Sequence, residues 1–195
     1  MLARVRSSAV LGIQGIPLAV EVDCHPGMLR FTIVGLPDAA VKESQERVLS
    51  AIRNSGFRAP RGVTVVNLAP ADIRKEGSAL DLPIALGLLA ATDQIPPERL
   101  SEYLLVGELA LDGSVRPVAG ALPMALAVRE QGLRGILLPA ANAEEAGVVP
   151  EVAVIPVHSL QEAADFMLGA KEIPPHVTDI EAAAKADTTS LNDFS

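Results

Sequence analysis

The 195-residue sequence contains one cysteine, Cys24, and no tryptophan. A single thiol excludes an internal disulfide and a thiolate metal cage. The longest apolar run, residues 82–91, is far shorter than the roughly 18 residues that a membrane-spanning helix needs. The first 25 residues also lack the apolar core of a signal peptide. These absences predict a soluble cytoplasmic protein that does not act at a membrane.

Metal and nucleotide motifs are missing as well. His25, His158 and His176 are scattered, and none lies at helical spacing from another histidine or from the cysteine. Neither G-x-x-x-x-G-K-[ST] nor G-x-G-x-x-G occurs, so the chain has no phosphate-binding loop of either kind. Aromatic residues make up only 3% of the sequence, which leaves no platform on which bases could stack. We therefore expect no metal, nucleotide or other cofactor to be bound by this segment.

Charge is unevenly distributed along the chain. The net charge is −8, yet residues 1–75 carry +4 and residues 76–195 carry −12. This asymmetry fits either ordinary surface solvation or a basic face and an acidic face, which would suit a polyanion or subunits packed head to tail. Overall acidity argues against strong nucleic-acid binding by the segment alone. The candidate DNA or subunit surface is a group of basic residues between whose first and last members Asp72 is the only acid: Arg53, Arg58, Arg61, Arg74 and Lys75.

Hydrophobic periodicity predicts a mixed α/β fold for residues 1–170. We expect strands over residues 2–10, 18–24, 29–35, 62–69, 135–139 and 152–156, with a hairpin turning at 112–113. Helices are expected from 38 to 54, from near 81 to 91, over 121–131, after 139, and over 159–168. Asp38 could cap the first helix, or Pro37 could lie in its first turn. Residues 171–195, with Pro174 and Pro175, are predicted to form a linker.

The loop before the most apolar helix reads KEGSALD, residues 75–81, and poses the question of catalysis. Ser78 could act as a nucleophile if a desolvated Lys75 accepted its proton. Lys75 lies only three residues away in a loop, where water would keep its ammonium charged. The alternative is that Ser78 is a turn residue and Lys75 a surface charge.

Two stretches together resemble the proteolytic domain of Lon-type proteases, which has the ribosomal protein S5 domain 2-like fold. They are KEGSALD and VGELALDGSVRPVAGAL, residues 75–81 and 106–122. The resemblance places the catalytic serine position on Ala79 and the catalytic lysine position on Leu122. A gap of one residue would instead place Ser78 on the serine position, still without a base from the second stretch. The resemblance therefore implies a Lon-like domain with no catalytic residues.

Longer runs resemble the N-terminal domain of the magnesium-chelatase-like AAA+ ATPases of the YifB/ComM family. They are VGLPDAAVKESQERVLSAIRNSGF, VNLAPADIRKEGSALDLPIALGLLAA and GELALDGSVRPVAGALPMALA. The resemblance implies a hexameric ATPase and DNA helicase that promotes branch migration in natural transformation. This chain would then act in ring assembly and DNA engagement.

The same resemblance places ATP and magnesium in an ATPase module outside this chain, for which residues 192–195 resemble the lead-in. Two alternatives stay open: a weak serine peptidase that uses Ser78, and an adaptor that binds another recombination protein.

Overall fold

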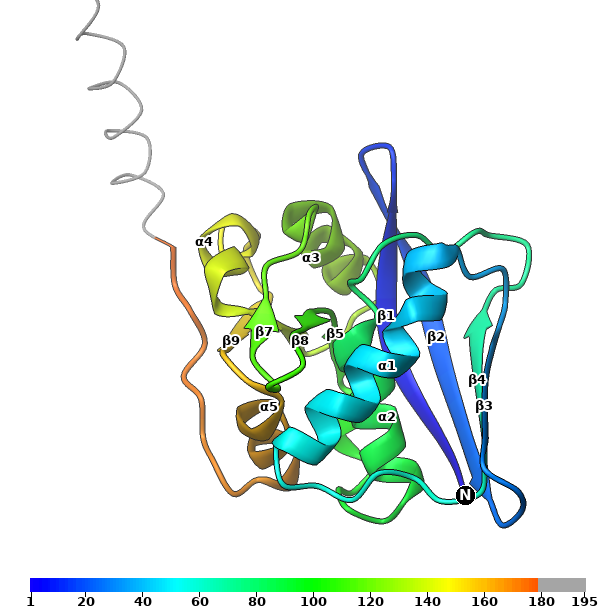
Figure 1. Ribbon diagram of the computed structural model, residues 1–195. Helices are drawn as coiled ribbons and strands as arrows, with labels where there is room; N and C mark the ends of the chain where they lie inside the picture. Colours follow the sequence, from blue (N-terminus) through cyan, green and yellow to red (C-terminus); the bar gives the residue numbers. More distant parts are fainter. Residues whose placement is uncertain (179–195) are drawn as a thin grey trace, which may run out of the picture.

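A seven-stranded mixed sheet with the order β3-β4-β2-β1-β5-β8-β9 forms the centre of the computed structural model, which describes residues 1–178 (Figure 1). The first half is a long antiparallel hairpin flanked by β4, and the second half is parallel. A separate two-stranded ribbon, β6 with β7, lies beside it. The strands are β1 (Leu2–Leu11), β2 (Gln14–His25), β3 (Arg30–Val34), β4 (Val63–Ala69), β5 (Tyr103–Leu105), β6 (Glu108–Leu109), β7 (Val115–Arg116), β8 (Gly135–Pro139) and β9 (Ala153–Val157).

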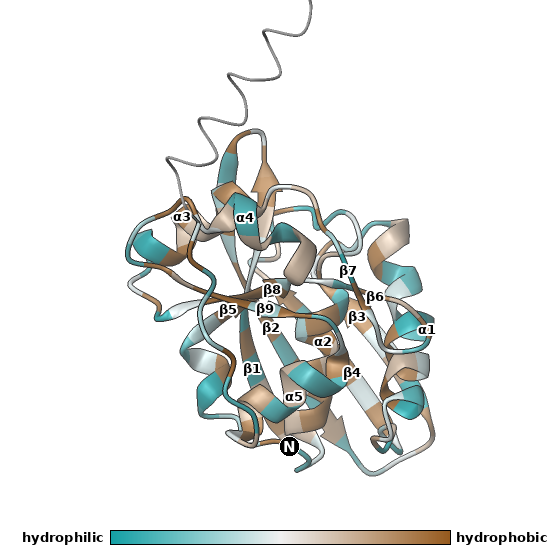
Figure 2. Ribbon diagram, turned by 90° about the vertical axis from the view of Figure 1, so that its left-hand side faces the viewer, coloured by the Kyte–Doolittle hydropathy of each residue, from teal (hydrophilic) through white to brown (hydrophobic). Residues whose placement is uncertain are grey.

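Helices cover both faces of the parallel half, because alternate residues of a strand point to opposite sides. Leu104, Ile136 and Val154 pack with α3 and α4, whereas Leu105, Leu137 and Ile155 belong to the larger core that contains α2 and α5. Figure 2 shows the two groups of helices on either side of these strands. The helices are α1 (Ala39–Asn54), α2 (Asp81–Ala91), α3 (Ala121–Glu130), α4 (Ala143–Ala146) and α5 (Leu160–Leu168), with 3₁₀ turns at Arg99–Ser101 and Ala140–Asn142.

Helix α2 is the centre of the larger core. All eleven of its residues are buried, as expected for a helix that is apolar all round. It begins at Asp81, so Pro83 falls in the first turn, where its missing N–H costs no hydrogen bond. The predicted start of this helix is confirmed. None of the helices within residues 1–178 is long and apolar enough to cross a membrane.

The mixed α/β architecture is confirmed, and two local predictions need comment. Asp38 rather than Pro37 is the capping residue of α1, because its Oδ1 accepts a hydrogen bond from the Val41 N–H at 2.8 Å. Strand β2 begins at Gln14 instead of residue 18, so the hairpin is longer than predicted.

The expected division at residue 170 stays a prediction, although the start of the predicted linker contacts the folded unit. Ile173 is buried in the larger core, and the His176 N–H donates to the Val154 carbonyl at 2.8 Å along the edge of β9. The remaining residues of the predicted linker, 179–195, including 192–195, lie outside the described residues.

Candidate functional site

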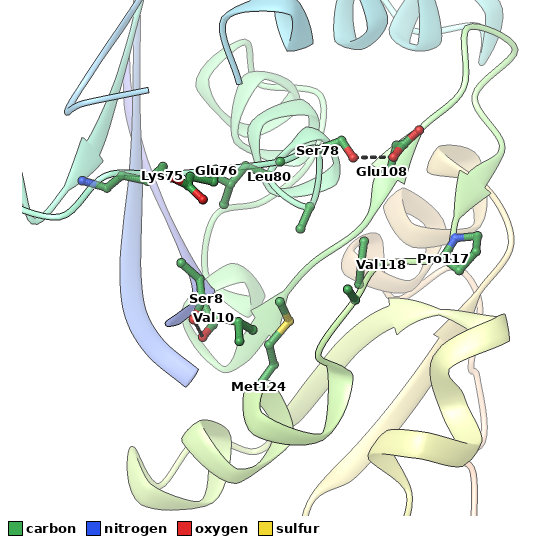
Figure 3. Close-up of a pocket in the computed structure, with 14 residues that line it drawn as sticks. Ser8, Val10, Lys75, Glu76, Ser78, Leu80, Glu108, Pro117, Val118 and Met124 are labelled. Carbon is green, nitrogen blue, oxygen red and sulfur yellow. Dashed lines mark hydrogen bonds between the residues drawn. The ribbon is translucent and has the colours of Figure 1, made fainter. Parts of the chain in front are cut away.

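A cavity of about 390 Å³ opens between β1, the loop before α2 and the segment that joins β6 to α3. Ser8 and Val10 form one wall, Ser78 and Glu108 lie opposite, and Met124 closes the floor (Figure 3). This is where the KEGSALD and VGELALDGSVRPVAG stretches meet, as the resemblance to Lon proteases requires. The full lining is Ser8, Ala9, Val10, Lys75, Glu76, Gly77, Ser78, Ala79, Leu80, Glu108, Pro117, Val118, Ala119 and Met124.

The loop over residues 75–79 is fixed at both ends by main-chain hydrogen bonds. On one side the Lys75 N–H donates to the Leu36 carbonyl at 3.0 Å, and the Asp38 N–H donates to the Lys75 carbonyl at 2.9 Å. On the other side the Gly107 N–H donates to the Ala79 carbonyl at 2.9 Å. The cavity wall is therefore tied to β3, α1 and the strand segment before β6, which makes it a preformed site.

Ser78 has a carboxylate as its partner. Its Oγ donates a hydrogen bond to Oε2 of Glu108, and Oε1 of Glu108 lies 3.6 Å from Nη1 of Arg116. Sequence reasoning did not predict the roles of Glu108 and Arg116. The paired strands β6 and β7 bring these two residues opposite each other, and a hairpin pairing predicted across residues 112–113 could have indicated the contact.

Lys75 is not the surface charge that the sequence predicted. Its side chain is fully buried, and its Nζ donates to the carbonyl oxygen of Pro70. Burial lowers the pKa of Lys75 below its ordinary value, although the charge of Asp72 opposes the shift. Figure 3 shows the amino group pointing away from Ser78. Lys75 therefore lines the cavity with its stem and does not present a base to the Ser78 hydroxyl.

Of the two positions carried over from Lon proteases, the structure brings only one to the cavity. Ala79 lies on its wall, beside the smaller core. Leu122 is 37% exposed, in the first turn of α3, and is not among the lining residues. Its N–H donates to Oε1 of Glu145 at 3.0 Å. A hydrocarbon side chain at either position offers neither a nucleophile nor a proton acceptor.

The predicted basic cluster is divided by the fold. Arg53, Arg58 and Arg61 are exposed where α1 turns into β4, whereas Arg74 follows β4 at the opposite end of the sheet (Figure 1). There, Nε of Arg74 lies 3.4 Å from a carboxylate oxygen of Glu76. Because Lys75 is buried and Arg74 is paired, three of the five candidates remain: Arg53 at the end of α1, and Arg58 and Arg61, which line one hollow in the turn that follows.

A buried ion pair beside the cavity was not predicted. Asp81 is fully buried and accepts hydrogen bonds from Arg47 Nε at 2.7 Å and Nη2 at 3.1 Å, and from the Leu109 N–H at 3.2 Å. Burial raises the pKa of Asp81 above its ordinary value, although the Arg47 and Leu109 hydrogen bonds oppose the shift. In the sequence, the only indication of this ion pair was a single carboxylate at the start of an otherwise apolar helix. The contact joins α1, α2 and β6.

Removing the cap of α1 should loosen the cavity wall. Oδ2 of Asp38 accepts a hydrogen bond from the Gly77 N–H at 3.2 Å in addition to capping the helix. Asp38→Ala should lower the free energy of unfolding by about 1 kcal/mol and speed amide hydrogen exchange at Gly77. Ser159→Ala removes the corresponding cap of α5, where Oγ accepts from the Glu162 N–H, and serves as the control. Equal exchange at Gly77 in both variants would contradict a specific link between the cap and the loop.

The fold and the cavity define a mixed α/β domain with distant similarity to Lon proteases. Lon protease of Bacillus thuringiensis is 28% identical over 145 residues, covering 70% of this chain and 18% of that protein. A family model described as subunit ChlI of Mg-chelatase matches residues 20–142.

Two closer relatives identify the family. The protein YifB of Escherichia coli (strain K12) is 41% identical over 192 residues, which is 97% of this chain and 38% of the relative. Competence protein ComM of Haemophilus influenzae is 41% identical over 173 residues, which is 89% of this chain and 34% of the relative. The chain therefore belongs to the ChlI-like Mg-chelatase family, together with YifB and ComM. It spans between 34% and 38% of the length of these two relatives.

Proposed function

We propose that this chain is a non-proteolytic Lon-like module, of the ribosomal protein S5 domain 2-like class, in a cytoplasmic AAA+ ATPase. The whole protein would act as a hexameric DNA helicase in branch migration during natural transformation. The module would help to assemble the ring and to engage DNA. Its relation to YifB and ComM supports this role, and similarity of fold to Lon proteases does not imply proteolysis.

The observation that carries the proposal is the chemistry of the cavity. Nucleophilic catalysis by a serine needs a base within hydrogen-bond reach of the hydroxyl. Ala79 has no hydroxyl, and Lys75 donates to the Pro70 carbonyl instead of accepting a proton from Ser78. The remaining partner of Ser78 is Glu108, which also faces Arg116. A carboxylate is ordinarily a much weaker base than the imidazole or amine that activates serine nucleophiles.

The binding of ATP and magnesium is part of the proposal for the whole protein. The sequence has no phosphate-binding loop, and residues 1–178 contain no group of three or more histidine, cysteine, aspartate or glutamate side chains that could hold a metal ion. We therefore assign nucleotide and magnesium binding to an ATPase module outside this chain, and no step of that chemistry to the residues described.

A serine-reactive phosphonate tests the rival peptidase function. Full-length protein and its Ser78→Ala variant should show the same background labelling and no hydrolysis of an unfolded protein substrate, with or without ATP. Wild-type full-length protein should form hexamers and move a four-way DNA junction in an ATP-dependent manner. Labelling of the wild type that disappears in Ser78→Ala would establish the peptidase. If a protein that lacks residues 1–178 still forms hexamers and still moves the junction, the assembly role is refuted.

A further inference from the structure

Three exposed arginines where α1 turns into β4 carry charge that no carboxylate neutralises. Within residues 1–178, Arg53, Arg58 and Arg61 make no ion pair. Five other arginines do pair with a carboxylate, namely Arg4, Arg47, Arg74, Arg116 and Arg134. Arg6, Arg30, Arg99 and Arg129 make no ion pair within these residues either, so the three differ from them in following one another along a single turn.

The main chain around Arg58 is held by a side chain from outside the turn. The Arg58 N–H donates to Oε1 of Gln94 at 2.8 Å, and Nε2 of Gln94 donates back to the Arg58 carbonyl at 2.8 Å. The same Nε2 lies 2.8 Å from Oγ1 of Thr92, which orients the amide. Because this pairing fixes the backbone before any ligand arrives, less conformational entropy is lost on binding.

Two of the three arginines border a hollow of about 280 Å³. Arg58 and Arg61 line it together with Ala59, Pro60, Thr92 and Gln94. Asp93 lines the adjoining hollow together with Arg61, and Asp112 follows Leu111, whose carbonyl accepts a hydrogen bond from Asn54 next to Arg53. The residues that line the hollow at Arg58 include two guanidinium groups and no carboxylate.

We infer that Arg53, Arg58 and Arg61 form a binding surface for the phosphate groups of an extended polyanion. A guanidinium group donates paired hydrogen bonds that match phosphate oxygens, and it stays charged at any physiological pH. Three such groups spread along one turn fit successive phosphates of a chain better than a single small anion. This inference rests on the proposed function, which makes the nucleic-acid backbone the expected source, and long-chain polyphosphate has the same chemistry.

Salt dependence of binding by the full-length protein tests the surface. Fluorescence anisotropy of labelled duplex DNA is measured between about 50 and 200 mM salt for wild type and for R53Q/R58Q/R61Q. Each phosphate contact on a duplex contributes about −0.9 to the slope of log K against log salt concentration. The magnitude of the slope should therefore fall by about 2 to 3 in the triple variant. The matched control, R4Q/R74Q/R134Q, removes the same charge from arginines that are already paired and should keep a slope close to wild type.

Competition distinguishes the sources of phosphate. Long-chain polyphosphate should displace DNA from wild type, and inorganic phosphate at equal phosphorus concentration should not. Polyphosphate binding that the triple variant retains would assign the surface to nucleic acid, and parallel loss of both ligands would assign it to phosphate chains in general. An unchanged slope in the triple variant, or an equal change of slope in the control variant, would overturn the inference. The proposed function is tested separately, by hexamer formation and junction movement.

Discussion

Replacing Asp81 with alanine should lower the free energy of unfolding by about 3 kcal/mol, because it removes the fully buried partner of an ion pair. The Asp81 carboxylate accepts three hydrogen bonds, two from Arg47 and one from the Leu109 N–H. Its loss leaves the Leu109 donor unsatisfied and the Arg47 guanidinium, on a side chain that is 22% exposed, without its counter-charge. Arg47→Met should cost a similar amount, since it leaves the carboxylate without a cation.

The double variant D81A/R47M is the informative comparison. Burial already raises the pKa of Asp81, which indicates that the protein stabilises this charge incompletely. Removing both partners should therefore cost at least about 1 kcal/mol less than the sum of the single losses. Urea unfolding followed by circular dichroism gives these values, because the chain has no tryptophan to report by fluorescence. Strict additivity of the two losses would show that the pair is not coupled.

Gly35→Ala should be about as destabilising, with an expected loss of about 3 kcal/mol. Gly35 follows β3 with φ +100°, a conformation that side chains rarely adopt, and a Cβ there would overlap the carbonyl oxygen of Leu68 in β4. Relief of that overlap requires the ends of β3 and β4 to separate. Leu36 would move with them, and its carbonyl holds the Lys75 N–H at the cavity wall.

Gly12→Ala provides the matched control for this substitution. Gly12 also has a positive φ, +64°, but nothing lies within 4 Å of the position its Cβ would take. The control should lose only about 1 kcal/mol from the conformation itself. Thermal and urea unfolding of both variants separate the two contributions. Equal losses would mean that the close approach to Leu68 contributes nothing.

Periodicity predicted most elements because their residues are governed by local rules. The start of helix α2 could be placed near Asp81, where the structure has it, since Pro83 is tolerated only near a helix start. Strand β2 was predicted too short because Gly15 and Pro17 normally interrupt strands. Proline has no N–H to donate to a neighbouring strand, so it is tolerated where a strand has an unpaired side. Pro17 lies at such a place, because β4 pairs with β2 only from Ala19 onward.

The candidate site was only partly predictable, for reasons that involve distance in sequence. Motif resemblance brought residues 75–81 and 106–120 together correctly, and Ala79 does line the cavity they form. The burial of Lys75 could not be foreseen, because lysines in polar loops are normally solvated and its carbonyl partner Pro70 is a property of the folded loop. The division of the basic cluster follows from β4, which separates Arg61 from Arg74 by the length of a strand.

The contact between the residues before Thr178 and the edge of β9 has a mechanical consequence. The hydroxyl of Thr178 donates to the Glu144 carbonyl at 3.2 Å beside α4, whereas the turn that carries Arg58 lies at the far end of the molecule (Figures 1 and 2). A load applied to the chain at Thr178 would reach α4 through this hydrogen bond and the edge of β9 through the His176 N–H. Under the proposed function, in which an ATPase module lies outside this chain, the folded domain would separate the turn that carries Arg58 from the end at Thr178 by its own length.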